Sequence, residues 1–295
     1  MKIFKLHPDM DARHYPLTKE IYLEMTSRMP PYVMLESDGK MRHYAVCPAC
    51  NNPVQIIGLH QQKVERAIYA KHIPKTIPRL ATYRQAAYEN CPLAAKSRIQ
   101  AEKSARKSGN DDLAPQILHI IERHFDRIVR VLQQALGIII SPKLAQALLE
   151  DYLAEEGYRY KYASLINIPW MIGYFARAKS LVYCLVKDEV MKKSIAEHEP
   201  NVVFSGDKLD KKGKSFLHID MYFSRHDIRP EGDAITESMD MVIVSHKNGV
   251  KKELFRKRIV FDYDSFQYLL NIPEGKGKRR EDLLTIAHQI LQQAG

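Results

Sequence analysis

Two cysteines three positions apart, in the segment Cys47-Pro-Ala-Cys50, constrain the fold of this chain more than any other feature. A redox pair needs its first cysteine at a helix N-terminus, where the helix dipole lowers the thiol pKa. Asn51, Asn52 and Pro53 follow the pair instead, and proline with the β-branched residues after it disfavours a helix there. Asparagine tolerates the left-handed backbone of a tight turn. The segment therefore predicts a metal-binding knuckle between two short strands.

A closed structural zinc site requires four ligands. Cys91 is followed by proline, as Cys47 is, and His72 ends a predicted strand, so the spacing Cys-x2-Cys-x21-His-x18-Cys supplies a Cys3His set. His60, on a predicted turn, and His43, on the strand that enters the knuckle, are alternative fourth ligands. No His-x-Glu precedes a Pro-Cys-x-x-Cys, which argues against a zinc deaminase. We expect a structural Zn²⁺ bound by Cys47, Cys50, His72 and Cys91.

Cysteine content and apolar patterning indicate the compartment. Four cysteines in 295 residues are too few for a secreted disulfide scaffold. Cys184 lies in an apolar stretch that predicts a buried helix, where the thiol would be inert core. The first residues lack a signal-peptide pattern, and no uncharged apolar run approaches the length of a membrane span. We expect a cytoplasmic protein with no membrane partner.

Positive charge is concentrated around the cysteines. Residues 40–107 contain 13 lysines and arginines against three glutamates, a local excess equal to the net charge of +10 of the whole chain. Segregated charge of this kind is typical of a polyanion-binding surface. Tyr69, Tyr83 and Tyr88 interleave with the cations and predict stacking on exposed bases. We expect phosphate contacts from Lys63, Arg66, Lys71, Lys75, Arg79, Arg84, Lys96, Arg98, Lys103, Arg106 and Lys107, the last five on a cationic helix.

The pattern along the chain predicts an α+β fold. We divide it into an N-terminal segment (residues 1–40), a zinc-ribbon-like basic module (41–108), a helical domain (109–198) and an α+β domain (199–295). Three short strands are expected at residues 42–46, 53–58 and 64–70. Apolar periodicity predicts helices over 113–136, 142–156 and 169–198, and Ser141 with Pro142 is a typical helix start. An alternating strand at 215–224, a hairpin turning at Asn248-Gly249 and a terminal helix complete the chain.

The knuckle resembles the zinc-ribbon type found in many DNA- and RNA-handling proteins, a resemblance confined to the residues around the metal ligands. Motifs for nucleotide hydrolysis, dinucleotide binding and a serine nucleophile are absent from the sequence. The sequence therefore favours a zinc-containing nucleic-acid-binding protein, a non-catalytic subunit of a nucleoprotein complex of the bacterial type, for DNA or RNA. Two alternatives stay open: an adaptor whose zinc module binds other protein subunits, and a metal-dependent nuclease using Asp220, Glu237, Asp240, Asp262 and Asp264.

Overall fold

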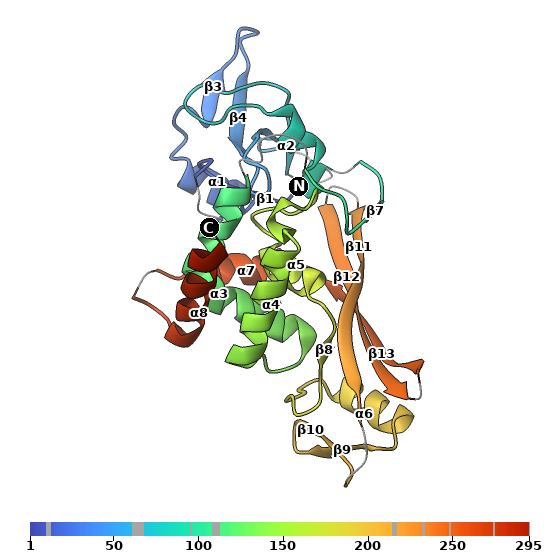
Figure 1. The fold of residues 1–295 in the computed structure, drawn as a ribbon. Helices are drawn as coiled ribbons and strands as arrows, with labels where there is room; N and C mark the ends of the chain where they lie inside the picture. Colours follow the sequence, from blue (N-terminus) through green and yellow to red (C-terminus); the bar gives the residue numbers. More distant parts are fainter. Residues whose placement is uncertain are drawn as a thin grey trace.

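The computed structural model confirms a mixed α+β architecture, with a C-terminal helix and several antiparallel sheets. It describes residues 1–9, 13–60, 68–94, 96–107, 113–213, 217–231, 234–247, 249–273 and 275–294. The molecule is elongated, with a small N-terminal module at one end, helices in the middle and a long β-sheet along one side (Figure 1).

The N-terminal module contains a four-stranded antiparallel sheet in the order β3-β4-β5-β6. Its strands are β3 (Val33–Leu35), β4 (Met41–Val46), β5 (Pro53–Ile57) and β6 (Tyr69–His72). The first two predicted strands are confirmed; of the third, Tyr69 and Ala70 lie in β6, and residues 64–67 lie outside the described residues. Because β3 pairs with β4, residues on both sides of the predicted boundary after residue 40 share one sheet.

Short elements surround this sheet. They are β1 (Ile3–Phe4) and β2 (Tyr15–Pro16), which pair with each other, α1 (Lys19–Met25), α2 (Gln85–Glu89) and the 3₁₀ turn η1 (Pro92–Ala94). Thr18 caps α1 by accepting a hydrogen bond from the Ile21 amide. The interior of the N-terminal module is a small hydrophobic cluster separate from the main core. It includes Phe4, Tyr22, Val54 and the three cysteines of the module.

Helices fill the middle of the molecule: α3 (Leu113–Leu136), α4 (Pro142–Ala154), α5 (Ile168–Phe175), α7 (Tyr263–Leu270) and α8 (Glu281–Ala294). The predicted start of α4 is confirmed, since Ser141 Oγ accepts from the Leu144 amide and proline occupies the first turn. Among the described residues, none of the helices combines the length and apolar character needed to cross a bilayer.

The predicted helix over 169–198 is wrong in its middle. The chain leaves α5 at Ala176 in an extended conformation, forms β8 (Lys179–Ser180) against the long sheet, and begins α6 (Glu189–His198) only after Asp188. Asp188 caps α6 by accepting a hydrogen bond from the Met191 amide, a second helix start that the apolar pattern conceals. Cys184 is consequently half-buried in an irregular segment.

The long antiparallel sheet has the order β13-β12-β11-β7, with β8 beside the other end of β11. Its main strands are β11 (Ile219–Glu231), β12 (Ala234–Lys247) and β13 (Val250–Val260). Lys247 pairs with Val250, and Gly249 has a φ of 76°, as expected for a two-residue hairpin turn; Asn248 lies outside the described residues. Between α6 and this sheet the chain forms a hairpin of β9 (Val202–Ser205) and β10 (Lys208–Lys211).

The cationic helix expected over residues 96–107 is wrong. Residues Ile99–Ala101 form β7, whose Gln100 pairs with Asp227 of β11. Ala101 is buried and Ile99 packs against the main core, so the alternating apolar residues of this segment serve a strand. The inner face of the sheet and the helices enclose that main core, and the other face of the sheet is turned away from the helices (Figure 1).

Candidate metal centre and basic sheet face

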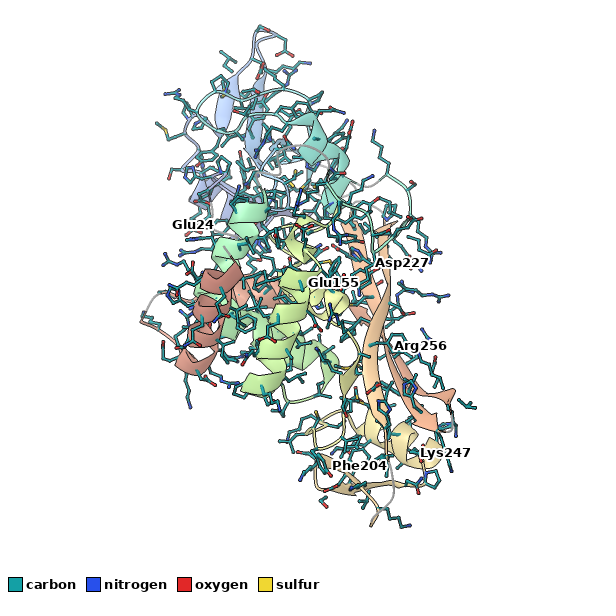
Figure 2. All side chains as sticks on the ribbon, in the orientation of Figure 1. Glu24, Glu155, Phe204, Asp227, Lys247 and Arg256 are labelled. Carbon is teal, nitrogen blue, oxygen red and sulfur yellow. The ribbon has the colours of Figure 1, made fainter. Side chains whose placement is uncertain are left out.

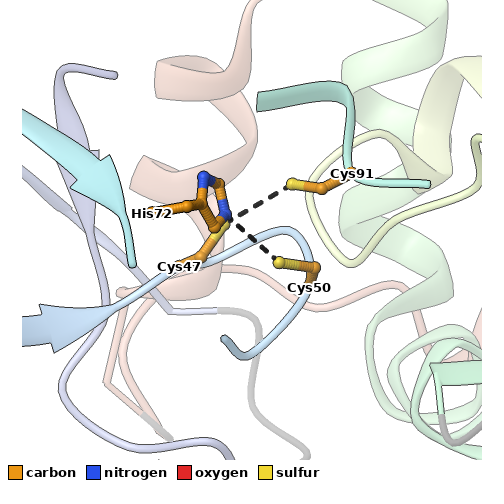
Figure 3. A group of neighbouring side chains, drawn as sticks. All are labelled: Cys47, Cys50, His72 and Cys91. Atoms are coloured by element: carbon orange, nitrogen blue, oxygen red, sulfur yellow. Dashed lines mark hydrogen bonds between the residues drawn. The ribbon is translucent and has the colours of Figure 1, made fainter. Parts of the chain in front are cut away.

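The four predicted zinc ligands meet at one point in the N-terminal module (Figure 3). Cys47 directly follows β4, Cys50 lies in the turn before β5, and His72 is the last residue of β6. His72 is the ladder partner of Val54, which places its ring beside the knuckle. Cys91 comes from the turn between α2 and η1 and completes the group from the other side.

The knuckle has the tight turn that two thiolates need in order to reach one ion. The Cys47 amide donates to the Asn52 carbonyl at 2.8 Å, and the Asn51 amide donates to the Cys47 carbonyl at 2.9 Å. Asn51 has a φ of 58°, in the left-handed region that asparagine tolerates better than most residues. The asparagines therefore explain why the chain turns here.

The spacing of the ligand atoms fits a tetrahedral ion. Cys47 Sγ lies 3.7 Å from Cys91 Sγ, and Cys50 Sγ lies 3.4 Å from His72 Nε2. Around a tetrahedral Zn²⁺ with bonds of about 2.3 Å to sulfur and about 2.0–2.1 Å to nitrogen, these separations would be about 3.8 and 3.6 Å. All four ligand atoms lie within 4.8 Å of one another, and the cysteines are free thiols. The arrangement can hold a metal ion without a change of fold.

Burial and mutual charge perturb the protonation of these groups. Burial alone would lower the pKa of His72, but the negative charge of Cys47 and hydrogen bonds to Cys47 and Cys50 raise it to about 10. Burial raises the pKa of Cys47, yet hydrogen bonds from Cys50 and Cys91 and the charge of His72 hold it well below its usual range. Burial raises the pKa of Cys50 and Cys91, so without a metal the group favours one thiolate, at Cys47, next to the positive charge of His72. A bound cation would stabilise all three cysteines as thiolates.

The structure brings His72, and neither rival histidine, to the cysteines. His43 and His60 lie next to each other instead, with their Nε2 atoms 3.1 Å apart. The alternative ligand sets are therefore not supported by the geometry. Two groups of side chains in the described parts of the chain could hold a metal ion. Only one of them contains cysteine, the group of Cys47, Cys50, His72 and Cys91.

Two asparagines that sequence reasoning treated only as turn formers also support the ligands. Asn52 Nδ2 donates to Cys50 Sγ at 3.4 Å and to the Arg84 carbonyl, while its Oδ1 accepts from the Arg84 amide at 2.7 Å. Asn51 Nδ2 donates to Gln116 Oε1 at 2.9 Å, which ties the knuckle to α3. Outer contacts of this kind orient metal ligands.

The residues predicted to contact phosphate fall into different environments. Lys75 is exposed, but its Nζ lies 2.9 Å from a carboxylate oxygen of Glu36. Five further cations are exposed: Lys71, Arg79, Lys96, Arg98 and Lys103. Arg84 and Lys107 are half-buried, and Lys63 and Arg66 lie outside the described residues.

Lys103 and Arg106 contact the protein interior rather than extending from a helix. Lys103 Nζ lies 5.3 Å from the ring centre of Tyr174, and burial lowers its pKa. Arg106 donates to the carbonyls of Lys103 and Glu155 and lies over the Phe175 ring. These two side chains hold β7 and α5 together.

The tyrosines predicted to stack on bases have neighbours within the module. Tyr88 lies edge-on to the His72 ring at 5.4 Å between ring centres, and Tyr83 lies 6.3 Å from Tyr88. Base stacking by these rings stays a prediction. Tyr88 also packs against a candidate metal ligand, His72, a contact that sequence reasoning did not identify.

A second basic surface, the basic sheet face, lies on the side of β7, β11 and β13 turned away from the helices (Figure 2). Its arginine side chains are 39–67 % exposed, while the two carboxylates between them, Asp227 and Asp240, are 4 % and 8 % exposed. Of its cations, the sequence indicated only Arg98, because they come from three separated segments. The basic sheet face consists of Arg98, Arg225, Arg229, Arg256 and Arg258.

Asp227 lies at the centre of this surface, and its carboxyl group makes the stability of the fold depend on pH. Burial raises the pKa of the Asp227 carboxyl, but hydrogen bonds from Arg229, Arg258 and Arg98 outweigh it and lower the pKa to about 2. The unfolded carboxyl titrates near pH ~3.9, so the carboxylate stabilises the fold above about pH 4, and this stabilisation disappears as the pH falls through about 2.

We therefore expect Asp227→Asn to lower the free energy of unfolding at pH 7, with a difference from the wild type that shrinks steadily between about pH 4 and pH 2. Urea unfolding of both proteins at pH 7, 4, 3 and 2 measures this. Asp264→Asn, in the first turn of α7, is the matched control. A difference that is independent of pH would contradict the assignment of Asp227.

The acids proposed for a nuclease are engaged separately. Glu237 is buried against His226, Asp240 pairs with Arg225 and Arg256, and Asp262 caps α7. Within the described parts of the chain, Asp220, Glu237, Asp240, Asp262 and Asp264 form no group of carboxylates able to hold a metal ion. Comparison with protein-family models, curated proteins and solved structures found none that matches this chain.

Proposed function

We propose that this is a zinc-containing nucleic-acid-binding protein in which the metal has a structural role. The observation that carries the proposal is the basic sheet face, where five exposed arginines surround two buried carboxylates. Guanidinium groups bind phosphate oxygens in a bidentate manner, and neutralised phosphates release counterions. A surface of this composition favours a polyanion over an apolar protein partner.

The Cys3His group supports zinc as the metal. Three thiolates and one imidazole in tetrahedral spacing suit Zn²⁺, and four protein ligands leave no open position for a reacting water. Exposed Lys71, Arg79 and Lys96 of the N-terminal module would add phosphate contacts to those of the basic sheet face. Free cysteines agree with a reducing compartment, and we place the protein in the cytoplasm, as a non-catalytic subunit beside other proteins on DNA or RNA.

Removing two arginines of β13 tests the proposal. We expect the double variant Arg256→Gln/Arg258→Gln to bind labelled DNA and RNA more weakly and with a smaller salt dependence. The slope of log affinity against log salt should fall by about 0.9 for each phosphate that the variant no longer neutralises on duplex DNA, and by about 0.7 on a single strand. Fluorescence polarisation over a series of salt concentrations measures both quantities.

Two matched variants complete the experiment. Arg177→Gln removes a 68 % exposed arginine that pairs with Asp151 and Glu155 near the end of α5, and its salt slope should equal that of the wild type. Arg256→Lys/Arg258→Lys keeps the charge and should restore most of the slope. Absent or salt-independent binding by the wild-type protein would overturn the proposal in favour of a protein-binding adaptor.

A further inference from the structure

Three side chains converge at one end of the long sheet. This end, where β11 begins and β12 finishes, is distant from the N-terminal module (Figure 1). His218 precedes β11, Asp220 is the second residue of β11, and His246 lies near the end of β12. Their ligand atoms all lie within 4.8 Å of one another. Of these three residues, sequence reasoning considered only Asp220.

Antiparallel pairing explains why they meet. Asp220 pairs with Val244 and Ile219 with Ser245, so His218 and His246 are opposite each other, and the His246 amide donates to the His218 carbonyl at 3.0 Å. Residues two apart on a strand share one face of a sheet, which brings Asp220 to the side of His218. The backbone thus sets the positions of all three side chains.

The distances are those of ligands around a small cation. Asp220 Oδ2 lies 2.9 Å from His218 Nε2 and 3.4 Å from His246 Nε2. Two ligand atoms bound at about 2.0–2.1 Å in a tetrahedral arrangement would be about 3.3 Å apart. The two imidazole rings stack at 4.7 Å between centres with planes 29° apart, which directs both Nε2 atoms at the same carboxylate oxygen.

We propose that His218, Asp220 and His246 bind a divalent first-row transition-metal ion at a second site, independent of the Cys3His centre. Two imidazoles and one carboxylate are a ligand set used for Zn²⁺, Fe²⁺ and related ions. The His218 and His246 side chains are 47 % and 36 % exposed, so the ion keeps coordination positions open to solvent. The site is on the same sheet as the basic sheet face, but its existence does not depend on nucleic-acid binding.

Metal stoichiometry tests the proposal. Zinc-replete protein, dialysed free of excess metal, should take up one further equivalent of Co²⁺ in a calorimetric titration. The added Co²⁺ should give weak visible bands, without the sulfur-to-cobalt charge transfer expected of the Cys3His centre. In the wild type it should also broaden the imidazole proton resonances of His218 and His246 and leave those of His288, on α8, unchanged.

Variants then assign the ligands. His246→Ala and Asp220→Asn should each weaken binding of the second equivalent at least about tenfold while keeping the zinc of the Cys3His centre and the wild-type melting temperature, which together report that the chain is folded. His288→Ala removes an exposed histidine and should bind both equivalents. Wild-type protein that takes up no second equivalent, or that takes it up without broadening His218 and His246, would overturn the proposal.

Discussion

Replacing Cys47 with serine is expected to release the metal and unfold the N-terminal module. Cys47 is fully buried, and its Sγ lies 3.7 Å from that of Cys91, so serine removes one of the four candidate ligands. The strands of the module are only three to six residues long, and their hydrophobic cluster is small. Metal binding supplies about 10–16 kcal/mol to zinc-finger peptides at pH 7, and small cores depend on such a contribution.

Elemental analysis and thermal unfolding measure this effect. The wild type should carry about one equivalent of zinc, and Cys47→Ser should carry far less and lose several kcal/mol of stability. A strong chelator should produce the same change in the wild type. Cys184→Ser, at a half-buried thiol outside the group, should retain both the zinc and the melting temperature. Full zinc content in Cys47→Ser would disprove the assigned centre.

The candidate metal centre could be predicted because its chemistry is local in sequence. The knuckle needs two cysteines at fixed spacing and asparagines that accept a left-handed turn, and both are readable from consecutive residues. To predict His72 as a ligand, it was enough to expect that its strand returns beside the knuckle. The start of α4 at Ser141 could be predicted for the same reason, since a cap acts on residues of its own first turn.

The predictions that were wrong concern segments whose structure depends on distant partners. Residues 96–107 are polar and basic enough to form an exposed helix in isolation, but β11 offers residues 99–101 an edge on which Ala101 is buried and Ile99 is partly buried. The helix expected over 169–198 was broken by pairing of β8 with the same strand. Sequence periodicity carries no information about such partners, because tertiary contacts override local propensity.

The basic sheet face and the His218–Asp220–His246 group were missed for a related reason. Each arises from the register between strands, and a shift of one residue would send every side chain to the opposite face. Arg98, directly before β7, and Arg258, in β13, are far apart in the sequence, yet both donate to Asp227. Only the paired strands show that these residues form one surface.

Glu237→Ala is expected to cause the largest loss of stability in the long sheet. The Glu237 side chain is fully buried, and its Oε1 accepts from His226 Nε2 at 2.6 Å and from Asn167 Nδ2 at 2.7 Å. Its Oε2 accepts from the hydroxyl of Tyr263, whose pKa is raised well above its usual range by burial and by the Glu237 charge. Tyr160 donates to the other ring nitrogen of His226 and extends the network.

Alanine at this position would leave three buried donors without their acceptor and would also open a cavity. Deleting one member of a buried polar pair typically costs about 3–5 kcal/mol, because the groups left behind remain desolvated. Glu237→Gln keeps the shape and one acceptor oxygen, and should therefore lose less stability than Glu237→Ala. Glu197→Ala, at an exposed position of α6, should change stability by less than about 0.5 kcal/mol. Urea unfolding of the four proteins at pH 7 measures these differences, and an alanine variant as stable as the glutamine variant would show that the Glu237 hydrogen bonds do not stabilise the sheet.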